Sequence, residues 1–113
     1  MKKKLLLLTA LLYGASLIAQ SDDAFSVFKA ALNNAIKHPT NPVAQSIAEE
    51  VFIRAICHNY NKLETIGMYA VAKKHESSPL VQTIFDNAHR TCPKNFNQIK
   101  VKYETQKERF IGL

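Results

Sequence analysis

The sequence predicts an all-α protein: a small bundle of four to five short helices with one disulfide, following an N-terminal signal peptide. Three observations support this fold class. Apolar residues recur at helical spacing in several segments, no stretch alternates apolar and polar residues as a half-buried strand does, and glycine-rich hairpin signals are absent. A chain of 113 residues has room for one such domain.

The N-terminus has the pattern of a secretory signal. Lys2 to Lys4 give it a positive start, and an apolar run from Leu5 to Ala19 follows. The small residues Ala19 and Ser21 resemble a cleavage site, so we expect a signal over 1–21, cut after residue 19 or 21. The apolar run is shorter than the ~20 residues that span a bilayer. We therefore expect only transient membrane contact, and a single helical domain at 22–113 in the periplasm or outside the cell.

The first mature helix is expected over Asp22–Lys37. Its two leading carboxylates are favourable at the positive end of a helix dipole. Two prolines within 38–42 then break the helix, because the residue before a proline avoids the α conformation. The apolar positions at helical spacing are Phe25, Phe28, Leu32, Ala35 and Ile36.

A second helix is expected over Pro42–Tyr60, with Asn41 as its cap and the proline at its first position. Its apolar surface is too wide for one stripe, which predicts that it is the central and most buried helix. Glu50 and Arg54 are spaced for a surface ion pair.

Three further helices complete the prediction. Asn61 is expected to cap the third, with Glu64 reaching back to it. Ser78 followed by proline starts the fourth, which must stop near Thr91 because Pro93 restricts the residue before it. The fifth is expected over 95–110.

The only two cysteines, Cys57 and Cys92, are expected to form a disulfide, because an oxidising compartment favours one. Such a bond closes a loop of about 35 residues and contributes roughly 3–4 kcal/mol in the chain-entropy model. A zinc site with His58 and His89 is the alternative. It is disfavoured because adjacent ligands diverge on a helix, so no metal or cofactor is expected. If the cysteines were reduced, His89 and Cys92 would be the pair to test as metal ligands.

Catalytic signatures are absent from the sequence: it has no Gly-x-Ser-x-Gly elbow, no phosphate-binding glycine loop and no haem attachment motif. Glu49 and Glu50 are neighbours whose side chains diverge, so they do not form a hydrolase pair. We therefore do not expect an enzyme.

A basic C-terminal stretch is the candidate binding surface. Loss of the three signal lysines leaves twelve basic and nine acidic residues, a net charge of +3, too small to indicate a nucleic-acid partner. The local excess of charge favours an acidic partner; the alternative is an ordinary solvated helix face. The residues concerned are Arg90, Lys94, Lys100, Lys102, Lys107 and Arg109.

Two partial resemblances bear on function. The segment from Cys57 through Lys94, with two short helices ending in Cys-Pro, resembles small exported helical immunity proteins that block toxins of type VI secretion. Cys92 and the lysine-rich run from Lys100 to Glu104 are similar to the tail of periplasmic acid-stress chaperones. Each covers less than half of the chain, and neither implies site residues.

The sequence thus predicts a small exported binding protein of inhibitor, immunity or adaptor type, whose partner is another protein, with a homodimer also possible. The alternative is a periplasmic chaperone or envelope-stress protein, and a small enzyme comes third. A chaperone would use groups that titrate near neutrality, for which the sequence offers four histidines. They are His38, His58, His75 and His89.

Overall fold

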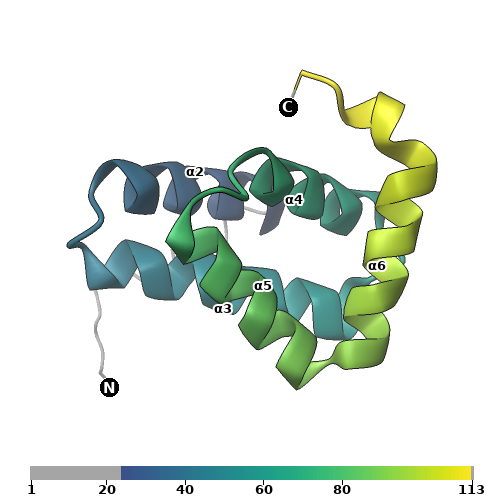
Figure 1. The fold of residues 1–113 in the computed structure, drawn as a ribbon, viewed down its shortest axis with the longest axis horizontal. Coiled ribbons are helices and arrows are strands. Elements are labelled where there is room, and N and C mark those ends of the chain that lie inside the picture. The colour runs from purple at the N-terminus through teal and green to yellow at the C-terminus, as the bar shows by residue number, and fades with distance from the viewer. Residues whose placement is uncertain (1–23, 113) are drawn as a thin grey trace.

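The computed structural model describes residues 24–112, and within that range it contains α-helices and one 3₁₀ helix but no β-strand (Figure 1). The all-α prediction is confirmed. The predicted signal peptide at 1–21 lies outside the described residues. The elements are α2 (Ala24–Lys37), α3 (Pro42–Asn59), α4 (Leu63–Lys74), α5 (Pro79–Thr91), α6 (Pro93–Gln106) and the 3₁₀ helix η1 (Lys107–Phe110).

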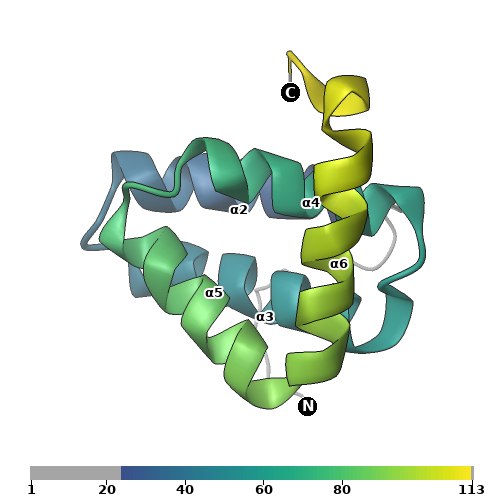
Figure 2. The same cartoon turned by 45° about the vertical axis from the view of Figure 1, so that its right-hand side comes forward.

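The helices form two layers closed at one end by a fifth helix (Figures 1 and 2). α2 and α4 pack side by side in one layer, and α3 and α5 pack in the other. α2 and α3 form an antiparallel hairpin that joins the layers. α6 runs across the ends of both layers and contacts α3, α4 and α5. Any surface feature of α6 is therefore anchored on three other helices.

The core lies between the layers and under α6. Each helix contributes side chains that lose all or nearly all of their exposure, and burial of each large apolar side chain contributes ~1.5–3 kcal/mol. The largest members are Phe28 and Leu32 of α2, Phe52 and Ile56 of α3, Met68 and Tyr69 of α4, Val81 and Ile84 of α5, and Ile99 of α6.

The most buried helix is α4, so the prediction that α3 would be central is wrong. Every residue from Thr65 to Ala72 is buried, whereas α3 keeps one side towards solvent. The cause is that α4 is covered by α2, α3, α6 and η1. Gly67 allows this close approach, since a Cβ there would lie 3.2 Å from Cε1 of Phe25 and 3.7 Å from Cε1 of Phe110.

The start signals of α3 and α5 act as predicted. The Asn41 Oδ1 accepts hydrogen bonds from the backbone N–H groups of Val43 and Ala44 at 3.1 and 3.3 Å. The Ser78 Oγ accepts one from Leu80 N–H at 3.2 Å. On the surface of α3, the predicted pair of Arg54 Nη2 and Glu50 Oε2 is also confirmed, at 2.8 Å.

The predicted cap of α4 is wrong. Lys62 rather than Asn61 occupies the N-cap position, and it provides no side-chain hydrogen bond. The reason is the turn that precedes the helix: the Lys62 N–H donates to the carbonyl of Asn59 at 3.0 Å, which places Asn61 inside the turn.

The last helix also differs from its predicted bounds of 95–110. α6 begins two residues earlier, because Pro93 takes its first position, where the fixed φ of proline suits a helix. Cys92 has φ −137° and ψ 73°, so it separates α5 from α6, as predicted. After Gln106 the chain tightens into η1.

Candidate binding surfaces

The disulfide prediction is confirmed: Cys57 and Cys92 are joined, with their Cα atoms 5.7 Å apart. The bond links the last turn of α3 to the corner between α5 and α6. Since both sulfurs are bonded, the alternative pairing of His89 with a free Cys92 thiol has no thiol to use. Across residues 24–112, no three His, Cys, Asp or Glu side chains come together as ligands of a metal ion.

A second tie fastens the same corner and was missed by sequence reasoning. The Asn95 side chain, in the first turn of α6, donates to the carbonyls of Ile56 and Cys57 at 3.3 and 3.0 Å. These carbonyls belong to the last turn of α3, which has no following helical turn to supply donors. The spacing of the sequence gives no signal for this contact, because it depends on the two helices crossing.

The first candidate site is a groove between α6 and the corner that joins α3 to α4. Its volume is about 580 Å³. Two of the six predicted basic residues, Lys94 and Lys102, line it, and no acidic residue does. Val101 also lines it, with 62% of its surface exposed. The other lining residues are Tyr60, Asn61, Asn97 and Gln98. We call this feature the α6 groove.

The remaining basic residues lie elsewhere. Lys107 forms an ion pair with Glu104 at 3.4 Å, and Arg109 lies beside them on η1. Arg90 on α5 donates to Asn87 Oδ1 at 2.7 Å. The Asn87 amide in turn donates to Glu49 of α3, so Arg90 takes part in a polar link between helices. The fourth, Lys100, faces a different hollow.

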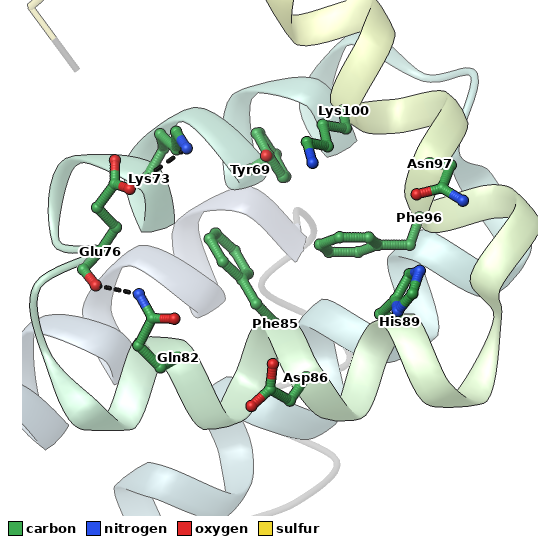
Figure 3. A pocket seen from close by; sticks show the side chains of 10 residues that line it. All are labelled: Tyr69, Lys73, Glu76, Gln82, Phe85, Asp86, His89, Phe96, Asn97 and Lys100. Atoms are coloured by element: carbon green, nitrogen blue, oxygen red, sulfur yellow. Dashed lines mark hydrogen bonds and ion pairs between the residues drawn. The ribbon is translucent and has the colours of Figure 1, made fainter.

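That hollow, which we call the aromatic hollow, opens between α4, α5 and α6 (Figure 3). It has a volume of about 280 Å³. Tyr69 and Phe85 stack with centroids 5.3 Å apart, and Phe96 approaches both edge-on, at 6.0 and 5.7 Å. These rings, rather than close backbone packing, fill the space where α4 and α5 diverge. Its polar rim consists of Lys73, Glu76, Gln82, Asp86, His89, Asn97 and Lys100.

Charges on the rim are only partly paired. Lys73 Nζ lies 3.3 Å from Glu76 Oε2. Within the described part of the chain, neither Lys100 nor Asp86 forms an ion pair. In Figure 3 they lie on opposite sides of the rings, with Lys100 on α6 and Asp86 on α5. The hollow therefore carries one free cation and one free anion.

The Tyr69 hydroxyl is the polar group at the floor. The residue is 2% exposed and lines the hollow. Burial, with smaller contributions from the charges of Glu104 and Glu76 and from Tyr103, raises the pKa of Tyr69 to about 12. The hydroxyl thus stays protonated and able to donate. The three rings that meet here come from three different helices, whose crossing the sequence does not predict.

No helix in residues 24–112 combines the length and the apolar character needed to cross a membrane. A comparison of the chain with protein-family models, with curated proteins and with solved structures finds no match in any of the three.

Proposed function

We propose that this chain is a small exported binding protein that acts by protein–protein contact without catalysis, and that the α6 groove is where an acidic partner docks. The observation that carries the proposal is the composition of the groove. Lys94 and Lys102 line it without an acidic counterpart, and the exposed apolar side chain of Val101 stands beside them. Complementary charge speeds and orients association, while a central apolar contact supplies affinity.

The fold supports this role by holding the groove rigid. The Cys57–Cys92 disulfide and the two hydrogen bonds of Asn95 fasten the first turn of α6 to the last turn of α3. Lys94 lies between these two ties in the sequence. A preformed surface loses less conformational entropy on binding than a mobile one, so a larger part of the contact energy appears as affinity.

Export is part of the same proposal. The disulfide suits an oxidising compartment, and the predicted signal at 1–21 would direct the chain there. Because cleavage would remove three lysines and no acidic residue, the basic surface of the mature protein would depend mainly on residues of α6 and its neighbours.

The test is site-specific photo-crosslinking in cells that make the protein. A photoreactive residue replaces Val101 in the groove, and a control replaces Val43, which is 65% exposed on α3. We expect one protein to crosslink from position 101 and not from 43, and the adduct to disappear in the double variant Lys94→Glu and Lys102→Glu. Equal labelling from both positions, or an adduct that survives charge reversal, would contradict the proposal.

The same material tests the chaperone alternative. A chaperone must expose a broad apolar surface under stress. In the described residues the exposed large apolar side chains are Val43 on α3, Leu63 on α4, Val101 on α6 and Ile111 just after η1, so no two share a helix. A binding protein should show little fluorescence from an apolar dye at pH 7 or pH 4. A large, reversible increase at acid pH would favour the chaperone.

A further inference from the structure

The aromatic hollow is a second potential site, which shares Asn97 but none of the other lining residues with the α6 groove. At about 280 Å³ it lies just below the range of ~300–1,000 Å³ that is typical of drug-sized ligands. Its floor of Tyr69, Phe85 and Phe96 offers ring surface to a flat apolar group. The hollow thus fits a molecule about the size of one amino acid.

The Tyr69 hydroxyl offers a ligand a polar contact at the floor. The residue is 2% exposed and lines the hollow. A tyrosine hydroxyl both donates and accepts hydrogen bonds, so a bound molecule with a polar atom at the floor would gain one.

The rim charges specify the kind of molecule. Lys73 and Glu76 neutralise each other, which leaves Lys100 on the α6 side and Asp86 on the α5 side. A ligand with one charge would satisfy one of these groups and meet a like charge across the hollow. A ligand that carries an ammonium and a carboxylate group close together would satisfy both.

We propose that the aromatic hollow binds a free α-amino acid with an aromatic side chain, in its zwitterionic form. The ring lies on the floor, the carboxylate faces Lys100 and the ammonium group faces Asp86. The Tyr69 hydroxyl forms a hydrogen bond with a polar atom of the ligand. Lys94 and Lys102 do not line the hollow, so this proposal does not depend on the docking of a partner at the α6 groove.

The test is titration of the isotope-labelled protein, followed by the amide resonances of α4, α5 and α6. The probes are phenylalanine, N-acetylphenylalanine, which lacks the cation, phenylalanine amide, which lacks the anion, and alanine, which lacks the ring. We expect phenylalanine to bind with a Kd on the order of 1 mM or below, and the other three about tenfold more weakly. The proposal would be overturned if N-acetylphenylalanine and phenylalanine amide bound as tightly as phenylalanine, or if phenylalanine gave no saturable shift.

Matched variants assign the two charges. Lys100→Gln should abolish the preference for phenylalanine over phenylalanine amide. Asp86→Asn should abolish the preference for phenylalanine over N-acetylphenylalanine. Both side chains are exposed, so the resonances of the core should stay in place and show that each variant is folded. Lys94→Gln, outside the hollow, is the control and should bind like the wild type. If it weakens phenylalanine binding as much as Lys100→Gln does, the charges act only at long range and the assignment fails.

Discussion

Removal of the Cys57–Cys92 disulfide should destabilise the protein severely. The bond joins residues 35 positions apart, and in the chain-entropy model a loop of this length restricts the unfolded chain by about 4 kcal/mol at 25 °C. The free energy of unfolding of a small domain is ~5–15 kcal/mol in total. Replacement of both cysteines by alanine would therefore remove a large fraction of the stability. Alanine avoids leaving an unsatisfied hydroxyl at these half-buried positions.

Urea unfolding followed by circular dichroism measures the effect. Three samples are compared: the oxidised protein, the same protein held reduced, and the double alanine variant. Reduction keeps every side-chain atom except the bond itself, so it isolates the crosslink from the packing of the sulfurs. We expect the reduced protein to lose about 3–4 kcal/mol, and the alanine variant to lose somewhat more. Reductant should not change the alanine variant.

A loss below about 1 kcal/mol on reduction would refute this reasoning. It would mean that the unfolded chain keeps the ends of α3 and α5 close together even without the bond. The slope of the unfolding transition tests this explanation. It should rise on reduction if the crosslink limits exposure of the unfolded chain, and stay constant if it does not.

Three further changes have defined outcomes. Asn95→Ala should cost about 1–2 kcal/mol in urea unfolding, because two end carbonyls of α3 lose their donor, whereas the exposed Asn97→Ala should cost almost nothing. Thr65→Val should raise the free energy of unfolding by roughly 1 kcal/mol, since the Thr65 hydroxyl is buried without a hydrogen bond; a loss would show that the hydroxyl has a partner. With a folded pKa of about 12 against an ordinary 10.0, Tyr69 keeps its proton in the folded state while the unfolded state releases it. Stability should therefore fall as pH rises from about 10 to 12, and Tyr69→Phe should fall less steeply in urea unfolding at each pH.

Much of the fold could be predicted because local signals decide it. A capping side chain followed by proline fixes the starts of α3 and α5, and the Cys-Pro pair fixes the break before α6. These signals act within a few residues of the chain. The prediction of α3 as the central helix failed for a different reason. It was based on the width of an apolar surface, whereas burial of α4 depends on how closely neighbours approach at Gly67.

The surfaces were less predictable than the fold because they depend on how helices cross. The six basic residues form one stretch in the sequence, yet the structure divides them among the α6 groove, the aromatic hollow, η1 and a link to α3. Lys100 and Lys102 are two positions apart and therefore point about 200° from each other around α6. Charge counted along a segment cannot separate two such sites.

α6 is the element on which both proposed sites depend, and it supports them through different contacts. The α6 groove lies beside the first turn of α6, which is fastened by the disulfide and by Asn95. The aromatic hollow depends on Phe96, whose ring lies against Tyr69 and Phe85 of the other two helices. Loss of the disulfide should therefore loosen the first turn of α6 and affect both sites, because Phe96 lies in that turn. Reversal of the groove charges leaves these rings untouched, so it should abolish partner binding while the hollow keeps its ligand.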